Sequence, residues 1–445
     1  IKWSELSIHQ AMLASASRTL ASALRCAGPC NGAAQALGAP KSTARIAGGQ
    51  WRAFNVLKSS LGDVELYREF EGDRVVLSTS RLEQFLEAEV THFANMKRNA
   101  LTLTDLLQDA ASPHRAAQHV REEIPKHFAA RLRQIEQLPD WSRDPDLKDL
   151  HRRYQLSFQE MRMTDEVSCD DLSSFPGVVR KLKQRQRKAL PLLGNATQRM
   201  SKRPGFCKDF WNIWIKKFLI SRISTEMLTS QYLAIVNQLE QGRTAITGIV
   251  DPECDPATVC ENAVLAAKQL TLSHTGVELV VEIESRSKRS HSFSYIPIYL
   301  HYILLELLKN ACYATARAVI KSSVADPVDP AAGKAIKVVI SSDEHRIAVR
   351  VSDLAGGIPF DVGDLVWDFL YSGWGDNQHA TPLSGYGLGL PLARLYAEYL
   401  GGTLSLVSLP EFGVDAYLFL PRISITPTFP PNAAELPQIQ VPEAP

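Results

Sequence analysis

The chain has 445 residues, of which 45% are hydrophobic and 22% are charged, enough for two globular domains with cores of ordinary size. Its formal net charge of +1 gives no general attraction to nucleic acid, and no apolar run is long enough to span a membrane, so neither kind of partner is expected. The seven cysteines are scattered and odd in number, which favours reduced thiols over a zinc site or a disulfide framework.

The first 48 residues have the most biased composition in the chain. Five Lys and Arg residues stand against a single acid, Glu5, in a stretch rich in Ala and Ser. Residues 7–26 can also form an amphipathic helix. This composition is typical of a mitochondrial transit peptide, so residues 1–48 are predicted to be a transit segment, with a disordered basic tail as the alternative.

Helical periodicity dominates the chain from residue 81 to residue 240. Apolar residues recur at i, i+3 and i+4, and turn signals that contain Pro interrupt the pattern. The predicted helices cover residues 81–99, 115–137, 146–162, 172–194 and 206–240. In the last and most apolar of them, the aromatic residues are expected in the core: Phe210, Trp211, Trp214 and Phe218. An antiparallel helical bundle is therefore predicted over residues 81–245.

After residue 251, predicted helices and strands alternate. The helices cover residues 256–271, 301–317 and 391–400. The strands cover residues 277–284, 335–341, 346–351, 403–409 and 414–420. Because short turns join two pairs of strands into hairpins, residues 246–422 are predicted to form a mixed sheet with helices on one face. The Pro-rich tail, residues 423–445, is expected to be extended or disordered.

Three polar side chains share one face of the helix 301–317, HYILLELLKNACYATAR. Glu306, Lys309 and Asn310 are spaced i, i+3 and i+4, while leucines on the other side supply a core. A solvated helix face is the simpler interpretation of such a set. The alternative is a metal–nucleotide site, in which a carboxylate acts as base, an amide oxygen binds the metal and a Lys meets phosphate.

A first glycine signal, SDLAGGIP, follows this helix in the sequence. Asp353 ends the predicted hairpin strand, and Gly356 and Gly357 turn the chain. A carboxylate at a strand end can accept a hydrogen bond from an adenine amino group, and glycines let the backbone approach a flat ring closely. A plain turn explains the segment equally well when it is taken alone.

A second glycine signal, SGYGLGLP, lies directly before a helix. The amide groups of Gly385, Gly387 and Gly389 at a helix N-terminus can cradle phosphate. The spacing differs from the dinucleotide-binding fingerprint, and no strand precedes it. The polar residues between the two signals, 371–384, are suited to form a lid over a nucleotide.

The order of these three signals resembles the GHKL ATP-binding fold, which is shared by histidine kinases, DNA gyrase B and MutL. Within that superfamily, the chain is similar to the mitochondrial kinases that regulate pyruvate and branched-chain 2-oxoacid dehydrogenases. The similar segments are ELLKNA (306–311), SD-x-x-GGIP (352–359), GLGLPLARLYAEYLGG (387–402), RISTEML (222–228) and VDPECD (250–255). The resemblance implies an α+β fold with an N-terminal antiparallel helical bundle followed by a GHKL-type α/β sandwich with a mixed sheet.

The resemblance also implies a role for each matching residue. Glu306 would be the general base on the hydroxyl of a target Ser, Asn310 would hold Mg²⁺, and Lys309 would lie by the phosphates. Asp353 would bind adenine with help from Gly357. The rest of the implied ATP-binding set lies in the lid and in the second glycine signal: Ser372, Gly385, Tyr386, Gly387, Leu388 and Gly389.

The function implied by the resemblance is that of a protein-serine kinase in the mitochondrial matrix, with ATP and Mg²⁺ as cofactors. Its substrate would be the E1 subunit of a 2-oxoacid dehydrogenase complex, which phosphorylation inactivates. RISTEML and VDPECD are more similar to the pyruvate dehydrogenase kinases, whereas YILLELLKNA is closer to the branched-chain enzyme. Pyruvate dehydrogenase is the preferred substrate and the branched-chain complex is the alternative. A homodimer or heterodimer is expected, with the E2 lipoyl domain as a further partner.

Three positions near the implied site depart from the family pattern. Tyr313 stands where an Arg is usual, and Leu354 and Ala355 replace an Arg and a Gly. Tyr313 and Ala355 favour, as a second alternative, a weakly active ATP-binding regulatory or scaffold subunit of the same complex. A histidine kinase is disfavoured, because neither His127 nor His151 stands in the motif of a phosphate-accepting histidine.

Overall fold

A computed structural model describes most of the chain between residues 66 and 422. The described residues are 66–70, 73–77, 79–99, 101–164, 174–243, 245–286, 292–325, 335–369, 371 and 387–422. The predicted transit segment, the Pro-rich tail and residues 372–384 of the predicted lid lie outside this set. The predictions for these three segments therefore stay predictions.

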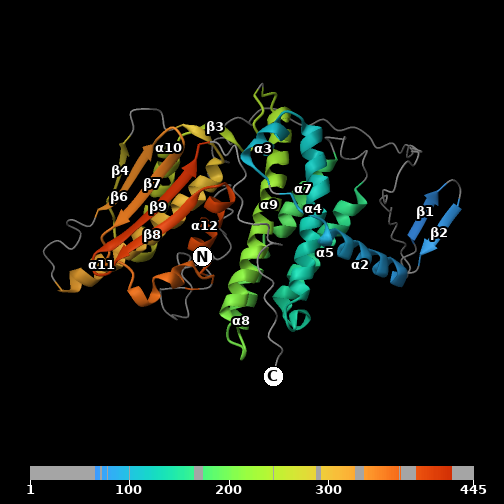
Figure 1. Ribbon diagram of the computed structural model, residues 1–445, viewed down its shortest axis with the longest axis horizontal. Helices are drawn as coiled ribbons and strands as arrows, with labels where there is room; N and C mark the ends of the chain where they lie inside the picture. Colours follow the sequence, from blue (N-terminus) through green and yellow to red (C-terminus); the bar gives the residue numbers. More distant parts are fainter. Residues whose placement is uncertain are drawn as a thin grey trace, which may run out of the picture. The chain divides into compact units, whose positions relative to one another are not determined.

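The N-terminal part of the described chain is a helical bundle, with α4 beside α2, α5 and α9 (Figure 1). Ser112 and Asp144 each accept hydrogen bonds from first-turn amides, and a Pro follows each, so α4 and α5 begin at strong N-caps. The described helices of the bundle are α2 (Thr79–Asn95), α3 (Leu103–Ala110), α4 (Pro113–Glu136), α5 (Pro145–Met163), α7 (Phe175–Gln186), α8 (Ala189–Met200) and α9 (Lys208–Glu240).

Aromatic residues of α9 form much of the bundle core. The rings of Trp214 and Phe218 stack with centroids 5.5 Å apart, and Tyr154 of α5 meets Phe218 edge-on at 5.8 Å. Such pairs contribute about 0.5–1.5 kcal/mol each beyond the apolar area that they bury. The prediction of aromatic core positions is confirmed for Trp211, Trp214 and Phe218, whereas Phe210 is only half-buried.

Two details of the predicted bundle are wrong. The helix predicted over residues 172–194 is two helices, α7 and α8. Pro191 lies in the first turn of α8, where its missing N–H removes no helical hydrogen bond. The short helix α3 was not predicted. Its signal is the capping box of Thr102 and Asp105, in which each side chain accepts the backbone N–H of the other residue.

The C-terminal part contains a mixed sheet of five strands in the order β4-β6-β7-β9-β8. β4 runs parallel to β6, and the other three neighbouring pairs are antiparallel. Both predicted hairpins are therefore confirmed, although the first strand begins at Val281 rather than at residue 277. The strands are β4 (Val281–Arg286), β6 (Ile336–Ser342), β7 (Arg346–Asp353), β8 (Thr403–Leu409) and β9 (Gly413–Pro421).

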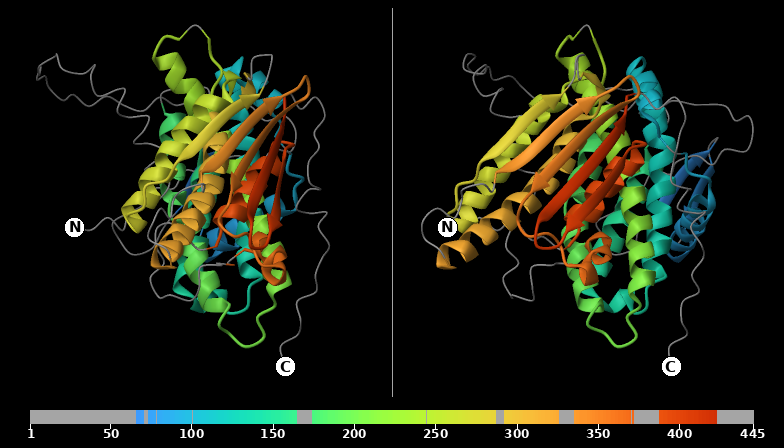
Figure 2. Two further views of the ribbon diagram at one scale, coloured as in Figure 1. Left: turned by 90° about the vertical axis from the view of Figure 1, so that its left-hand side faces the viewer. Right: turned by 60° about the vertical axis from the view of Figure 1, so that its left-hand side comes forward.

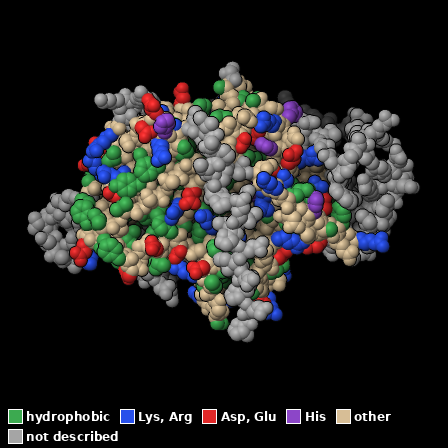
Figure 3. Space-filling view, in the orientation of Figure 1, with side chains coloured by type: hydrophobic (Ala, Val, Ile, Leu, Met, Phe, Trp, Pro, Cys, Tyr) green, Lys and Arg blue, Asp and Glu red, His purple; other side chains and the backbone are tan. Residues whose placement is uncertain are grey.

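Three helices cover one face of this sheet: α10 (Pro256–Thr275), α11 (Pro297–Ala325) and α12 (Gly389–Tyr399) (Figure 2). Alternate strand residues such as Val338, Val349 and Leu418 are buried beneath them, as the period of two requires. No described helix covers the opposite face, where apolar side chains are visible (Figure 3). The exposed apolar residues of the β8–β9 hairpin are Val407, Leu409, Phe412 and Phe419. The predicted α+β fold is thus confirmed.

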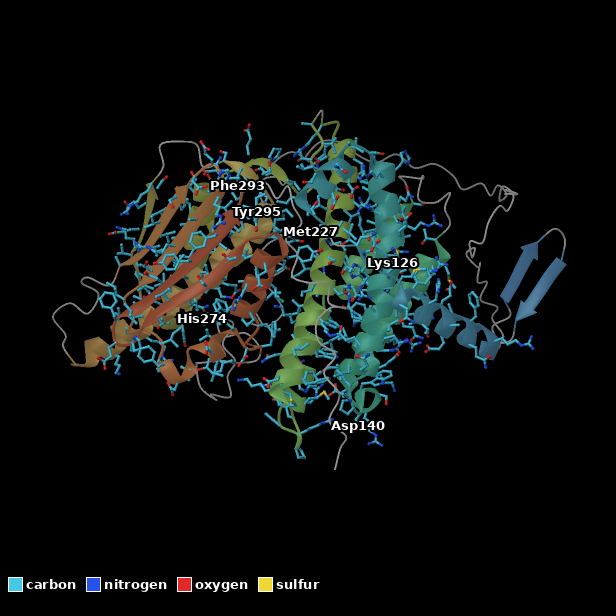
Figure 4. The ribbon with its side chains drawn as sticks, in the orientation of Figure 1. Lys126, Asp140, Met227, His274, Phe293 and Tyr295 are labelled. Carbon is cyan, nitrogen blue, oxygen red and sulfur yellow. The ribbon has the colours of Figure 1, made fainter. Side chains whose placement is uncertain are left out.

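Two small antiparallel pairs were not predicted: β1 (Leu66–Phe70) with β2 (Asp73–Leu77), and β3 (Asp251–Cys254) with β5 (Phe293–Tyr295). Phe293 and Tyr295, labelled in Figure 4, are buried and stack with centroids 5.1 Å apart. Because α11 begins two residues after β5, this pair fixes the start of the helix that carries the candidate site.

Among the described residues, no helix combines the length and apolarity that a membrane crossing requires.

Candidate active site

Glu306 and Lys309 form a buried ion pair on α11. Their side chains are 5% and 8% exposed, and Lys309 Nζ lies 2.7 Å from Glu306 Oε1. A buried charge is tolerated when it is paired and hydrogen-bonded, as it is here. The two side chains are therefore not part of a solvated helix face, and the simpler interpretation of the sequence does not hold for them.

Asn310 follows Lys309 on the same helix and is half-buried. Within the described part of the chain, its side-chain amide has no hydrogen-bond partner. No group of three or more His, Cys, Asp and Glu side chains suited to hold a metal occurs among the described residues. One amide oxygen together with phosphate oxygens fits Mg²⁺, which is commonly held by few protein ligands and by the substrate.

Glu306 also lies directly against the first residue of α12. A Cβ atom on Gly389 would overlap Oε2 of Glu306, so a larger residue there would displace the carboxylate from its present position. Gly387 adopts the left-handed conformation, with φ of 68°, and Leu388 is buried. The structure therefore brings the predicted base and the second glycine signal together. Gly385, Tyr386 and Ser372 lie outside the described residues.

Asp353 is buried at the end of β7, and its carboxylate accepts a hydrogen bond of 3.0 Å from the N–H of Ala355. Burial raises the pKa of Asp353 to about 6, although the backbone N–H groups of Ala355 and Val414 act in the opposite direction. Burial raises the pKa of the Cys312 thiol to about 12, and the nearby Asp353 charge adds to that rise. The strand β7, which Asp353 ends, packs against α11, and Cys312 of α11 lies roughly 9 Å along the helix axis from Glu306.

The first glycine signal packs against the turn between β8 and β9. Gly357 has φ of 71°, and a Cβ atom there would overlap the carbonyl oxygen of Leu409. The N–H of Gly356 donates to the carbonyl of Phe412 at 3.2 Å, and the N–H of Ile358 donates to Ser408 Oγ at 2.6 Å. The positive φ of Gly357 and its close contact with the Leu409 carbonyl thus require glycine at this position. Its predicted part in adenine binding stays a prediction.

The two neighbouring glycines give a matched test of this packing. Gly356 also has a positive φ, of 99°, but no atom lies within 4 Å of a Cβ built on it. Gly356→Ala should lower the free energy of unfolding by the left-handed strain alone, about 1–2 kcal/mol. Gly357→Ala should cost about 1–3 kcal/mol more because of overpacking against Leu409. Urea denaturation of both variants measures the difference, and equal losses would show that the backbone contact is not tight.

Sequence reasoning missed a polar connection between the bundle and the site. Tyr302 of α11 and Tyr396 of α12 meet edge-on at 5.2 Å. The pKa values of both phenols are raised, mainly by burial, and the guanidinium of Arg222 of α9 partly offsets the rise. The charge of Glu306 also contributes to the raised pKa of Tyr302. Arg222 begins the RISTEML segment, so the segment was identified but its contact with the site helices was not.

Comparison with known proteins gives two matching family models. Residues 99–251 match the model described as mitochondrial branched-chain alpha-ketoacid dehydrogenase kinase. Residues 296–424 match the model described as histidine kinase-, DNA gyrase B-, and HSP90-like ATPase. The second match contains Glu306, Asp353 and Gly389, and so covers the whole site described above.

Curated relatives are similar over most of the chain. Pyruvate dehydrogenase (acetyl-transferring) kinase isozyme 4, mitochondrial, of Ictidomys tridecemlineatus is 28% identical over 357 residues, which cover 76% of this chain and 84% of the relative. The Homo sapiens isozyme 4 is 27% identical with the same coverage. The Arabidopsis thaliana pyruvate dehydrogenase (acetyl-transferring) kinase, mitochondrial, is 27% identical over 75% of this chain and 93% of its own length.

Proposed function

Because the chain belongs to the mitochondrial 2-oxoacid dehydrogenase kinase family, within the GHKL superfamily, we propose that it is an ATP- and Mg²⁺-dependent protein-serine kinase. Its proposed substrate is the E1 subunit of a 2-oxoacid dehydrogenase complex, which phosphorylation would inactivate. The observation that carries the proposal is the buried carboxylate of Glu306, paired with Lys309 and pressed against Gly389 at the start of α12.

The proposed mechanism assigns one task to each group around that carboxylate. Glu306 accepts the proton of the attacking Ser hydroxyl, and Lys309 neutralises charge on the phosphates. Asn310 would ligate Mg²⁺, which neutralises the charge that develops on the transferred phosphoryl group. Asp353 would accept a hydrogen bond from the adenine amino group. Phosphoryl transfer depends mainly on positioning and charge neutralisation, so a single carboxylate base suffices.

The choice of dehydrogenase is part of the proposal. The curated relatives are named pyruvate dehydrogenase kinases, which supports pyruvate dehydrogenase as the substrate. The family model matched by residues 99–251 is named for the branched-chain enzyme, which supports the alternative. The relatives are also named mitochondrial, and we propose the mitochondrial matrix as the location of this chain.

The proposed organisation follows the predicted segments. Residues 1–48 would be a transit segment, 81–245 the bundle domain that binds partners, 246–422 the kinase domain and 423–445 a Pro-rich tail. A homodimer or heterodimer is proposed, and the E2 lipoyl domain is a further proposed partner. The exposed apolar residues of the sheet face without a helix, such as Val407 and Leu409, support association through that face.

Incubation of the full chain with Mg-ATP and each purified dehydrogenase complex tests the proposed function. We expect phosphate on Ser of the pyruvate dehydrogenase E1 subunit, read by mass spectrometry, together with loss of dehydrogenase activity. Phosphate on the branched-chain E1 alone would establish the alternative substrate. A chain that phosphorylates neither E1 subunit would contradict the kinase proposal.

A second candidate function is a weakly active ATP-binding regulatory or scaffold subunit of the same complex. It is favoured by Tyr313, Leu354 and Ala355, which replace residues that the family pattern has beside the nucleotide. The same incubation separates the two functions, because a scaffold would bind Mg-ATP and the complex without transferring phosphate.

A further inference from the structure

The segment that leads from the first glycine signal toward the second is fastened to the bundle helix α9. It contains the short helices η2 (Phe360–Val362) and η3 (Asp364–Trp367). Asn212 of α9 uses both ends of its amide there: Nδ2 donates to Asp368 Oδ1 at 2.8 Å, and Oδ1 accepts the N–H of Phe369 at 2.9 Å. Lys208 Nζ lies 2.6 Å from the other oxygen, Asp368 Oδ2.

The same segment is connected to α12 through a neighbouring residue. The guanidinium of Arg394 lies over the ring of Trp367, 4.5 Å from its centroid, and its Nε donates to Glu398 Oε1 at 3.0 Å. Glu398 Oε2 lies 3.6 Å from Lys216 Nζ, which returns the chain of contacts to α9. The contacts therefore form a closed ring that joins α9, the η3 segment and α12.

The α9 side of this ring has a simple sequence basis. Lys208, Asn212 and Lys216 are spaced four residues apart, which places them on one face of the helix. The adjoining residues Trp211, Trp214 and Phe218 are buried with their aromatic contacts. One helix therefore packs in the bundle and also holds two segments of the C-terminal part: the η3 segment, which precedes the second glycine signal, and α12, which begins within it.

We propose that Asn212 and Asp368 are positioning residues that couple the bundle to the nucleotide site. We call the set Lys208, Asn212, Lys216, Asp368 and Glu398 the α9 clamp. A shift of α9 changes the position of α12, whose first residue, Gly389, is in contact with Glu306. The clamp thus sets the geometry of the glycine turn against the base, and with it the affinity for nucleotide. This inference rests on the proposed nucleotide site.

The bidentate contact of Asn212 allows an exchange experiment. Asn212→Asp keeps an acceptor for the N–H of Phe369 but removes the donor to Asp368 and places two carboxylates side by side. Adding Asp368→Asn restores one carboxylate and one amide in the reverse order, so both hydrogen bonds can form again. Lys208 can then pair with the carboxylate at position 212, one helical turn away.

The readout is the ADP affinity of the full chain by calorimetry, with thermal unfolding measured in parallel. Asn212→Asp should weaken ADP binding about tenfold, the equivalent of about 1.4 kcal/mol. The exchanged pair should return the affinity to within about threefold of wild type. Lys217→Met, on α9 but outside the clamp, is the matched control and should bind ADP as wild type does.

Wild-type ADP affinity in a folded Asn212→Asp variant would overturn the coupling, as would an exchanged pair that folds and stays weak. If Asn212→Asp does not fold, Lys208→Met removes only the ion pair and should weaken ADP binding about threefold; unchanged affinity would again overturn the coupling. A wild-type chain that binds no ADP would instead overturn the proposed nucleotide site and the coupling with it. Failure of the clamp and failure of the proposed function are therefore distinguishable.

Discussion

Glu306→Gln should reduce phosphate transfer to E1 by about 10²–10⁴-fold, the usual contribution of a positioned general base, and should leave Mg-ATP affinity nearly unchanged. The proton is accepted only during transfer, so loss of the base acts on the transition state rather than on the bound nucleotide. Gln keeps the shape of the side chain and can still accept the hydrogen bond from Lys309, which preserves the packing against Gly389.

The matched comparison for Glu306→Gln is Asn310→Ala on the same helix. Removal of the proposed metal ligand should lower both the affinity for Mg-ATP and the rate of transfer. Single-turnover kinetics with Mg-ATP and E1 separate the two effects. Equal losses of affinity and rate in Glu306→Gln would show that Glu306 contributes to nucleotide binding and not to proton transfer.

Asp353→Asn should raise the free energy of unfolding of the nucleotide-free protein at pH 7 by about 2–3 kcal/mol. Burial raises the pKa of Asp353 to about 6, whereas the same carboxyl in the unfolded chain titrates near 4. Between these values the folded state binds more protons, so the ionisation of Asp353 destabilises the fold progressively as the pH rises from about 4 to about 6. The gain from Asn should therefore be complete above pH 6 and should fade as the pH falls toward 4.

Urea denaturation at pH 5 and at pH 7.5 measures this dependence. Asp361→Asn, which removes an exposed carboxylate from η2, is the control and should change stability little at either pH. If the gain in stability from Asp353→Asn were equal at both pH values, the ionisation of Asp353 would not be its cause.

Replacement of the Asp353 carboxylate should also weaken nucleotide binding. Asp353→Ala leaves the adenine amino group without its acceptor in a buried site, which costs about 1–3 kcal/mol, or about tenfold or more in affinity. Calorimetry with ADP checks this value. ADP affinity equal to wild type in the folded variant would remove Asp353 from the site. A carboxylate that destabilises the empty protein and is needed for a ligand is expected at a functional position.

The sequence was sufficient for the elements that depend on local patterns. Helical spacing placed α11 and α9, and alternation with short turns placed the β6–β7 and β8–β9 hairpins. The position of Glu306, Lys309 and Asn310 on one helix face followed from their spacing alone. Pro191 was predicted within a continuous helix, although a Pro fits best in the first turn of a new helix, which is where the structure has it.

Contacts between distant segments could not be derived in this way. Nothing in the spacing showed that Glu306 would meet Gly389, more than 80 residues later, or that Asn212 would hold Asp368. Those contacts depend on how α9, α11 and α12 pack together, which local propensity does not determine. The burial of the Glu306–Lys309 pair depends on the same packing. This burial is the observation that distinguishes a candidate site from a solvated helix face.

We infer that α11, the end of β7 and the first turn of α12 form one Mg-nucleotide site. Titration of the wild-type chain with ATP, in the presence of Mg²⁺ and again with the metal removed by a chelator, tests it most directly. We expect saturable binding of one ATP per chain and weaker binding without Mg²⁺, since Asn310 would then hold no metal against the phosphates. No saturable binding of ATP, or binding that is indifferent to Mg²⁺, would contradict it.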